Sequence, residues 1–314
     1  MANYITVDGG TTNTRVHLVL DGTVVDRIKL SVGAKNGIDG KNSLKSALHD
    51  AIETILARNG LNVRDVERIL ASGMITSEFG LCPLKHITIP AGIKELREGM
   101  HETVISEISE IPFAFVRGVI TDCIDLDRAD MIRGEETELM GILREGNKDV
   151  LYVLPGSHSK LISVDRQGKI VDFRTMLTGE LFFAVSQNTI LKNAVEITPE
   201  GFDEAQLLNG YEYCLSHGIN EALFKVRILK NVFGMTAQVC YSFLLGVILC
   251  GEVREIVKAE ESTVILGGQK QLREALKILL SQCSHKNIIS LSDAEVENST
   301  ANGAIRIYEM KITE

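Results

Sequence analysis

Two short segments of the sequence combine glycine with small hydroxyl residues at the turn between two apolar runs. The first, DGGTTNTR at 8–15, follows the strand-like run Tyr4–Asp8, and the second, LPGSHSK at 154–160, follows Val150–Leu154. The backbone N–H groups of such a turn can converge on an anion, and glycine lets a phosphate approach the backbone. Asp8 ends its strand beside this turn, where a carboxylate can hold Mg²⁺ through water. The pattern therefore predicts two phosphate-binding turns, one of them with a metal-binding carboxylate.

The candidate phosphate-binding residues are the glycines, the hydroxyl residues and their polar neighbours in these two turns. Lys160 would add a cation close to a bound phosphate, whereas His158 is also typical of an exposed loop. A glycine-rich hairpin with a solvated Asp8 is the structural alternative for the first turn. The residues assigned to phosphate binding are Gly9, Gly10, Thr11, Thr12, Asn13, Gly156, Ser157, His158, Ser159 and Lys160.

A third glycine-containing segment stands between a strand and a helix. The apolar run Ser262–Leu266 leads into Gly267 and Gly268, and a helical pattern begins at Gln269. Glycine at this junction lets a flat ligand lie against the backbone, near the positive N-terminal end of the helix. We therefore predict that a flat ligand lies against Gly267 and Gly268, although a Gly-Gly pair also occurs in ordinary turns.

The predicted elements follow the same order in both halves of the chain: three strands, a helical region and a further strand. In the first half they span 4–8, 15–20, 23–30, 42–59 and 66–72. In the second half they span 150–154, 161–164, 169–176, a long helical region and 262–266, followed by a helix from 269 to about 283. This order predicts an α/β protein with a duplicated domain, and a single mixed α/β domain is the alternative.

Composition and charge limit the classes of function. The 314 residues are 45% hydrophobic and 24% charged, which is enough apolar material for two domains. The net charge of −9 argues against nucleic acid or an anionic membrane as a partner, because both bind basic surfaces. The most apolar run, 239–250, is shorter than the ~20 residues of a bilayer span and predicts a buried helix. Four residues are assigned to this helical core: Met235, Cys240, Tyr241 and Cys250.

The cysteines and the N-terminal sequence favour a cytoplasmic protein. The N-terminus leads directly into a strand pattern, without the basic and apolar regions of a secretion signal. The six cysteines are scattered and form no CxxC pair, so we expect reduced thiols and neither disulfides nor a structural zinc site.

Taken together, the three glycine-containing segments resemble the ATPase superfamily of actin, Hsp70 and the sugar kinases, over nearly the whole chain. Several stretches resemble the 2-dehydro-3-deoxygalactonokinase family more specifically. They are DGGTTNTR at 8–15, SGMITS at 72–77, RGEET at 133–137, LPGSHSK at 154–160 and LTGELF at 177–182. Two positions depart from the family pattern: Gly9 stands where tryptophan is usual, and Arg117-Gly118 stands where Pro-Gly is common.

The resemblance implies two duplicated ribonuclease-H-like domains with a nucleotide and substrate cleft between them. It also implies that Gly267 and Gly268 contact the adenosine part of the nucleotide. The expected domains are 1–147, with the C-terminal helix 297–314 packing back on it, and 148–296. In that helix Ala301, Gly303 and Ala304 are small enough for close helix contact. The family implies ATP and Mg²⁺ as cofactors, a sugar-acid substrate and a monomer or homodimer. Its reaction would convert 2-dehydro-3-deoxy-D-galactonate to the 6-phosphate in galactonate catabolism.

The superfamily places the catalytic base at the start of the first interdomain helix, here GEETELMG at 134–141. A carboxylate can accept the proton of the attacking hydroxyl. Glu136-Thr137 matches the Asp-Thr pair of related hexose kinases, so Glu136 is the predicted base and Glu135 the reserve. Acidic residues in a first helical turn also stabilise the helix dipole, by ~0.3–1 kcal/mol, which is the structural alternative.

The substrate pocket is predicted from one cation and from polar residues at strand ends, where Ser72 should lie at the same edge as Asp8. Arg133 would meet the substrate carboxylate or the transferred phosphoryl group, unless it pairs with the neighbouring glutamates. The residues assigned to substrate binding are Ser72, Gly73, Met74, Arg133, Thr178, Gly179 and Glu180.

Two other functions remain open from the sequence. A kinase for another sugar or sugar acid would use the same phosphate turns. A nucleotide-dependent switch or sugar sensor would hydrolyse ATP without phosphorylating a sugar.

Overall fold

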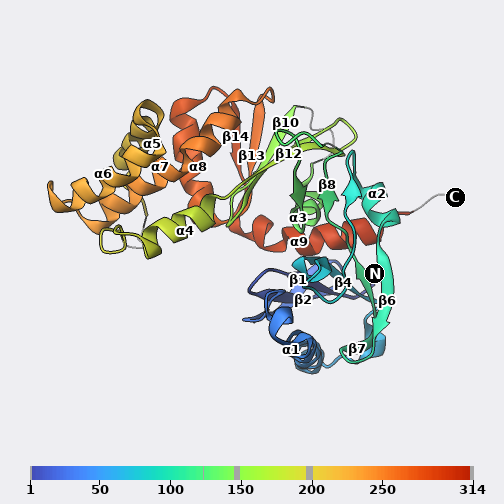
Figure 1. Cartoon of the computed structure of the whole chain (residues 1–314). Coiled ribbons are helices and arrows are strands. Elements are labelled where there is room, and N and C mark those ends of the chain that lie inside the picture. The colour runs from blue at the N-terminus through green and yellow to red at the C-terminus, as the bar shows by residue number, and fades with distance from the viewer. Residues whose placement is uncertain (1, 123, 145–148, 196–200, 312–314) are drawn as a thin grey trace. The chain divides into compact units, whose positions relative to one another are not determined.

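The computed structural model describes residues 2–122, 124–144, 149–195 and 201–311, with the backbone alone described for 36–42. By its internal contacts the chain divides into two compact units (Figure 1). Unit 1 comprises Met1–Asn147, Val164–Asp172 and Asp293–Glu314, and unit 2 comprises Lys148–Ser163 and Phe173–Ser292. The expected domain boundary between residues 147 and 148 lies outside the described residues.

Unit 1 is built on a six-stranded sheet in the order β3-β2-β1-β4-β7-β6. β1 runs antiparallel to β2 and parallel to β4, and β4 runs parallel to β7. Asp21 and Gly22 have φ values of 49° and 77°, as the tight hairpin between β2 and β3 requires. The strands are β1 Tyr4–Gly9, β2 Thr14–Leu20, β3 Thr23–Leu30, β4 Arg68–Gly73, β6 His101–Ile105 and β7 Ser109–Phe115.

Helices from opposite ends of the chain cover the two faces of this sheet. α1 (Asn36–Arg58) packs apolar side chains such as Ile52 against one face, with the odd-numbered side chains of β1. Because side chains alternate along a strand, Tyr4 points to the other face, where α9 (Asp293–Tyr308) lies. There the rings of Tyr4 and Tyr308 meet edge-on, 5.8 Å between centroids. β1 is therefore fixed from both sides, up to the residues that begin the first turn.

Unit 1 also contains small elements that the sequence did not predict. They include a three-stranded sheet in the order β5-β8-β9, a short helix and two single-turn 3₁₀ helices. Their bounds are β5 Ile87–Thr88, β8 Val119–Ile120, β9 Met131–Ile132, α2 Ile93–Glu98, η1 Val63–Asp65 and η2 Met74–Thr76.

Unit 2 repeats the strand order of unit 1. Its five-stranded sheet runs β12-β11-β10-β13-β14, which corresponds to β3-β2-β1-β4-β7 in the first sheet. The directions agree as well, since β10 runs antiparallel to β11 and parallel to β13, and β13 runs parallel to β14. The repeated element order that the sequence predicts is confirmed in these strands. They are β10 Val150–Leu154, β11 Ser159–Val164, β12 Ile170–Met176, β13 Thr263–Leu266 and β14 Asn287–Ser290.

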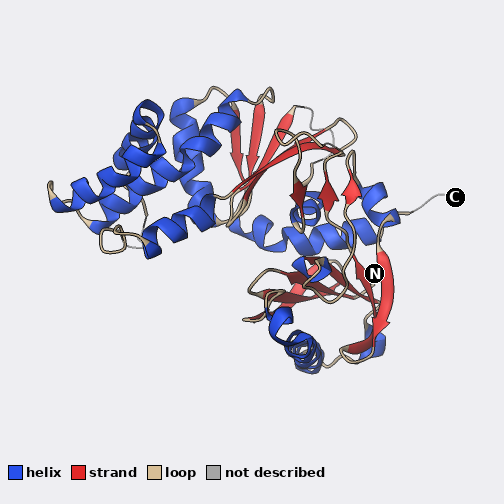
Figure 2. Ribbon diagram, viewed as in Figure 1, coloured by secondary structure: helices blue, strands red, loops and turns tan. Residues whose placement is uncertain are grey.

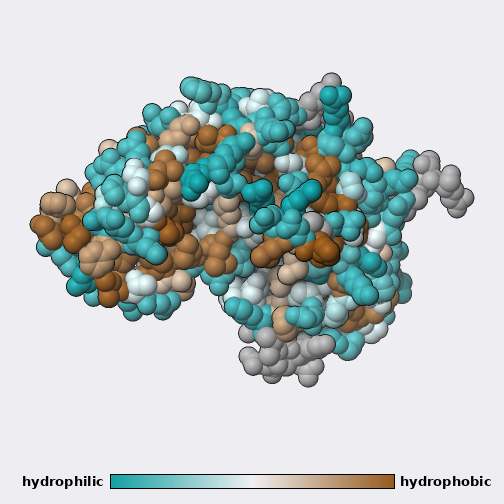
Figure 3. All heavy atoms as spheres, turned by 45° about the horizontal axis from the view of Figure 1, so that its top comes forward, coloured by the Kyte–Doolittle hydropathy of each residue, from teal (hydrophilic) through white to brown (hydrophobic). Residues whose placement is uncertain are grey.

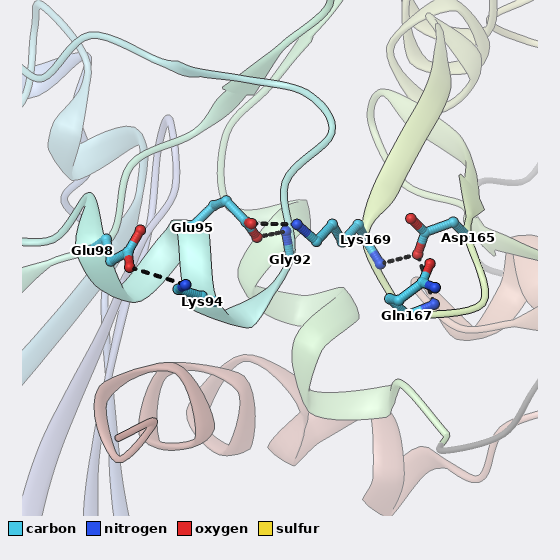
Figure 4. A network of polar contacts seen from close by, with 7 residues as sticks. All are labelled: Gly92, Lys94, Glu95, Glu98, Asp165, Gln167 and Lys169. Atoms are coloured by element: carbon cyan, nitrogen blue, oxygen red, sulfur yellow. Dashed lines mark hydrogen bonds and ion pairs between the residues drawn. The ribbon is translucent and has the colours of Figure 1, made fainter. Parts of the chain in front are cut away.

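The tip of the hairpin between β11 and β12, residues 164–172, belongs to unit 1 and is bound to α2 by polar contacts (Figure 4). The ammonium group of Lys169 pairs with the carboxylate of Glu95, whose Oε2 also accepts the N–H of Gly92 at 2.9 Å. Asp165 Oδ1 accepts the N–H of Lys169 at 2.9 Å and closes the turn. These contacts lie within unit 1, between its segment 164–172 and α2.

Helices fill the rest of unit 2, beside its sheet (Figure 2). They are α4 Thr178–Asn188, α5 Glu204–His217, α6 Ile219–Asn231, α7 Ala237–Lys258 and α8 Lys270–Cys283. The predicted buried helix is confirmed in α7, where Cys240, Tyr241 and Cys250 are all buried. The prediction for Met235 is wrong: α7 begins after its N-cap Thr236, so Met235 precedes the helix and is exposed. Within the described residues, no helix has the length and apolar character needed to span a bilayer.

The outer part of unit 2 carries apolar side chains on its surface. α6 buries Ala222 and Val226 against the core but exposes Phe224, and Val232 and Phe233 are exposed just after it. Figure 3 shows apolar surface at this end of the molecule, amid otherwise mostly polar residues. α6 therefore carries a large apolar side chain, Phe224, among the polar residues of its outer side.

In unit 1, α3 (Glu135–Ile142) and α9 cross with their backbones in contact. A Cβ added to Gly303 would lie 1.8 Å from the carbonyl oxygen of Thr137, and one added to Gly141 would lie 1.8 Å from that of Ser299. The predicted close contact of Gly303 with another helix is thus confirmed. This crossing fixes the first turn of α3, which carries the candidate base.

Candidate active site

Asp8 lies at the end of β1, next to a buried hydroxyl. In the parallel pair β1–β4, Asp8 is opposite Ser72 and Gly9 is opposite Gly73, so the two strands end together as predicted. The Asp8 side chain is 22% exposed, and its Oδ2 accepts a hydrogen bond from Arg15 Nη1 at 2.8 Å. Burial raises the pKa of Asp8, and the Arg15 charge partly offsets this rise. Among the described residues the buried Ser72 hydroxyl has no hydrogen-bond partner.

The first turn is tightly closed and carries exposed polar groups. The N–H of Gly10 donates to the carbonyl of Asn13 at 2.8 Å, which closes the turn at residues 10–13. Thr12 and Asn13 are exposed and Thr11 is half-buried. A Cβ added to Gly9 would lie 2.7 Å from Ile75 Cβ. Glycine therefore fits this position, where the related family usually has tryptophan, because Ile75 occupies the space.

The two glutamates at the start of α3 differ in their surroundings. Glu136 is fully buried: its Oε2 accepts the N–H of Gly134 at 2.7 Å and its Oε1 accepts the Thr137 hydroxyl at 2.9 Å. Burial, helped by the charge of Glu135, raises the pKa of Glu136 to about 7. Glu135 is half-buried, its Oε2 accepts the N–H of Arg133 at 3.1 Å, and its charge also raises the pKa of Asp8. Of the two glutamates, Glu135 is therefore the one whose charge acts on Asp8.

The raised pKa of Glu136 predicts a pH dependence of stability. An ordinary glutamate titrates at 4.5 and Glu136 at about 7, so the folded protein binds the extra proton between these values. The contribution of Glu136 to the free energy of unfolding therefore falls as pH rises from 4.5 to 7. We expect Glu136→Gln to be more stable relative to the wild type at pH 8 than at pH 5, measured by urea denaturation. A difference that is the same at both pH values would contradict this assignment.

The side chain of Arg133 is used inside unit 1. Its Nη1 donates to the carbonyl of Thr76 at 2.8 Å and its Nη2 donates to the carbonyl of Leu84 at 3.1 Å, with His86 beside it. These contacts join the start of α3 to the segment that follows β4. The guanidinium therefore holds the loop between residues 76 and 86, and the charge of Glu136 also acts on it.

The end of β4 meets the start of α3. Gly73 has a φ of 82°, and a Cβ there would lie 2.6 Å from the carbonyl oxygen of Gly9 and 3.3 Å from Asp8 Oδ1. Gly134, with a φ of 108°, precedes α3, and a Cβ on it would lie 3.2 Å from Gly73 Cα. These close approaches gather Asp8, Ser72 and Glu135 in one region of unit 1. Met74 begins η2 immediately after Gly73, and the sugar contacts of residues 72–74 stay a prediction.

The second turn, in unit 2, is held from within by its own polar side chains. The N–H of Gly156 donates to Ser159 Oγ at 3.3 Å. Lys160 is only 3% exposed, and its ammonium group donates to the carbonyl of His158 at 2.8 Å. His158 is exposed and its Nε2 lies 2.6 Å from Glu180 Oε2. Lys160 therefore braces the turn, while Ser157 and His158 face solvent.

The start of α4 supports the same turn. The N–H of Gly179 donates to the carbonyl of Gly156 at 3.1 Å, and the N–H of Glu180 donates to the carbonyl of Ser157 at 3.0 Å. The Thr178 hydroxyl donates to Glu252 Oε2 on α7, at 2.8 Å. The structure thus brings residues 178–180 to the second turn, and their contact with a sugar acid stays a prediction.

The Gly267-Gly268 segment lies at the same end of the sheet as the second turn. Gly268 has a φ of 63°, and a Cβ there would lie 2.3 Å from the carbonyl oxygen of Pro155. The N–H of Gln269 donates to that same oxygen at 2.6 Å, and the buried Arg273 donates to the carbonyl of Gly268 at 2.8 Å. Both segments follow strands of the parallel pair β10–β13 and leave the sheet at one edge. The adenosine contact itself stays a prediction.

Sequence analysis missed two buried charged residues of unit 2, Glu252 and Arg273. Both lie on helices, and the bonds just described join them to Thr178 and Gly268. Burial raises the pKa of Glu252 to about 7. For Glu252, the signal in the sequence was a glutamate two residues after the apolar run 239–250, on a helix predicted to be buried.

Comparisons with known proteins agree on one family. The family model described as 2-keto-3-deoxy-galactonokinase matches residues 8–307. The 2-dehydro-3-deoxygalactonokinase of Escherichia coli is 26% identical over 273 residues, which cover 85% of this chain and 86% of that protein. A solved structure from Sinorhizobium meliloti, assigned to the same activity, matches with a TM-score of 0.78 and 22% identity over 97% of both chains. The activator of 2-hydroxyisocaproyl-CoA dehydratase from Clostridium difficile matches in fold, with a TM-score of 0.52 and 13% identity over 98% of this chain and 93% of that chain.

Proposed function

Because the chain belongs to the 2-keto-3-deoxy-galactonokinase family, we propose that it transfers the γ-phosphoryl group of ATP to the 6-hydroxyl of 2-dehydro-3-deoxy-D-galactonate. The observation that carries this proposal is the family match over residues 8–307, which includes both turns, the Gly267-Gly268 segment and the start of α3. The protein is therefore a sugar-acid kinase, a phosphotransferase with an alcohol acceptor and ATP as donor. Its fold, with the same strand order in two sheets, is the α/β fold of the actin, Hsp70 and sugar-kinase superfamily.

We propose that unit 2 binds the nucleotide. The second turn exposes Ser157 and His158 at the carboxyl end of β10, and Gly267-Gly268 lies beside it at the carboxyl end of β13. Ligands of parallel sheets commonly bind at this end of the strands. The second turn would hold phosphates through backbone N–H groups, and Gly268 would leave space for the adenosine.

The metal site that we propose is Asp8, with Mg²⁺ as the ion. The residues fit this ion, because Asp8 offers a partly exposed carboxylate and Ser72 a buried hydroxyl without a partner among the described residues. Both are the hard oxygen donors that Mg²⁺ prefers. Bound there with ATP, the ion would neutralise charge on the phosphates. Arg15, which pairs with Asp8 in this structure, would then be released toward solvent or substrate.

For the base we propose Glu135, the reserve candidate of the sequence analysis. A base must come within hydrogen-bond distance of the substrate hydroxyl. Glu135 is half-buried in the region of Asp8, whereas Glu136 is fully buried with a donor at each carboxylate oxygen. In this assignment Glu136 holds the first turn of α3 in shape and Glu135 accepts the proton.

We further propose a cytoplasmic monomer or homodimer that takes part in galactonate catabolism. Five cysteines are free thiols in the structure, and Cys123 lies outside the described residues. The free cysteines are Cys82, Cys214, Cys240, Cys250 and Cys283. Light scattering of the purified protein would give the oligomeric state.

A coupled assay of ADP release tests the reaction. We expect Mg-ATP turnover to rise strongly with 2-keto-3-deoxygalactonate, less with 2-keto-3-deoxygluconate, and not with galactonate or simple hexoses. EDTA should abolish the stimulated rate, because the metal is needed on the phosphates. Equal background hydrolysis with every sugar would contradict the proposed substrate and favour a nucleotide-dependent switch. Stimulation by a different sugar alone would indicate a kinase of other specificity.

A further inference from the structure

Glu252 is a carboxylate buried in unit 2, close to the second turn. It lies on α7, it is 1% exposed, and its Oε2 accepts the Thr178 hydroxyl at 2.8 Å. Its Oε1 is also buried and makes no hydrogen bond of ordinary geometry with the described residues. Burying a carboxyl group whose oxygens are not all hydrogen-bonded is unfavourable. A role for Glu252 in the folded protein is therefore expected.

The same carboxyl lies close to Ser159, a residue of the second turn. The hydroxyls of Thr178 and Ser159 both lower the pKa of Glu252, against the larger effect of burial. Ser159 Oγ in turn accepts the N–H of Gly156 at 3.3 Å. The Ser159 hydroxyl therefore lies between the carboxyl of Glu252 on α7 and the backbone of the turn.

A second connection runs through the start of α4. Thr178 is the first residue of α4, and the next two residues donate their N–H groups to the carbonyls of Gly156 and Ser157. A Cβ added to Gly179 would lie 2.6 Å from the carbonyl oxygen of Gly156, so the helix and the turn are in direct contact. Fixing Thr178 on Glu252 thus fixes the helix end that holds the turn.

We propose that Glu252 is a positioning residue that holds the backbone of the second turn, through Ser159 and Thr178, in the arrangement that binds the phosphates of ATP. Both connections converge on residues 156–159, the segment whose N–H groups would face a phosphate. The inference rests on the proposed role of this turn in nucleotide binding. It adds a buried determinant of ATP affinity that does not itself touch the nucleotide.

Kinetics of Glu252 variants test the proposal. Glu252→Leu should raise KM for Mg-ATP and Kd for ADP about tenfold, equivalent to ~1.4 kcal/mol. ADP binding is measured without the sugar acid, so the predicted sugar contacts of residues 178–180 do not affect this result. Glu252→Gln keeps an acceptor for both hydroxyls and should bind ADP within about twofold of the wild type. A purely structural role would lower the active fraction, and hence kcat, while leaving KM and Kd unchanged.

Two further variants separate this inference from the assignment of the turn. Ser157→Glu places a carboxylate in the exposed part of the turn and should weaken ADP binding if phosphates bind there. If Ser157→Glu weakens ADP and a folded Glu252→Leu does not, the role of Glu252 is refuted and the turn assignment stands. If Ser157→Glu has no effect on ADP, the turn itself is misassigned. Glu255→Gln, one turn further along α7 and paired with Arg174 and Lys258, is the matched control and should leave ADP binding unchanged.

A second variant tests the proposal if Glu252→Leu does not fold. Thr178→Val removes the hydroxyl that Glu252 accepts and keeps the shape of the side chain. It should raise KM for Mg-ATP in the same direction, by a smaller factor than Glu252→Leu. An unchanged KM for Mg-ATP in folded Thr178→Val would overturn the connection through α4.

Discussion

Glu135→Gln should lower kcat by about 10²- to 10⁴-fold, the usual contribution of a general base, with KM for Mg-ATP within about twofold. The amide keeps the size of the side chain and can still accept the N–H of Arg133, but it cannot accept the proton of the attacking hydroxyl. The loss should therefore be confined to the chemical step. Single-turnover measurements of sugar-acid phosphorylation would show it directly, and circular dichroism would confirm the fold.

Glu136→Gln is the matched control for this variant. It stands one residue further along α3 and makes its hydrogen bonds to Gly134 and Thr137 within the same helix turn. We expect its kcat to fall by less than about tenfold, since its role is to shape the helix start. The opposite ranking, with Glu136→Gln much less active than Glu135→Gln, would return the base to the residue that sequence analysis favoured.

Gly303→Val should destabilise the protein by more than ~3 kcal/mol, beyond the usual range for an overpacked core. The atom that a Cβ would meet is a backbone carbonyl of α3, 1.8 Å away, so neither helix can adjust by rotating a side chain. Separating α3 from α9 would also move the first turn of α3, which carries Glu135. Urea denaturation would measure the loss, and kcat of the folded fraction would report on the displaced glutamate.

Gly303→Ala and Gly251→Ala provide the graded comparison. Even the methyl group of alanine collides at Gly303, so this variant should also be destabilised. Gly251 lies inside α7, is exposed, and has no atom within 4 Å of an added Cβ. Alanine there should stabilise the protein by up to ~1 kcal/mol, because it favours the helix more than glycine does. If Gly303→Ala and Gly251→Ala change the free energy of unfolding by similar amounts, the two helices cross less closely than in the structure.

The sequence predicted the turns well because their chemistry is local. The Gly and hydroxyl pattern at 8–15 and 154–160 marks a strand, a tight turn and a second strand, and each element forms where it was expected. The tendency of parallel strands to end at one edge also placed Ser72 beside Asp8. These predictions needed only short stretches of chain and the rules of strand pairing.

Other parts of the site depend on contacts between distant segments. Nothing near Arg133 in the sequence shows that its guanidinium binds carbonyls at 76 and 84. In the sequence, Glu252 resembles an ordinary polar residue near the end of an apolar helical segment. Its hydrogen bond with Thr178 forms only because α7 and α4 pack together. The choice between Glu135 and Glu136 likewise depends on burial, which two adjacent glutamates in a sequence do not reveal.

The close crossing of α3 and α9 also provides a check on sequence alignments between distantly related chains. At 26% identity, sequence alignments of such chains can slip by a few residues within helices. A slip of one residue at this crossing would place a side chain where Gly303 contacts Thr137 or Gly141 contacts Ser299, and the two backbones leave no space for it. A correct alignment should therefore pair small residues at both positions simultaneously. This pair, about 160 residues apart in the chain, can be used to judge whether a proposed match of two kinase sequences has the right register.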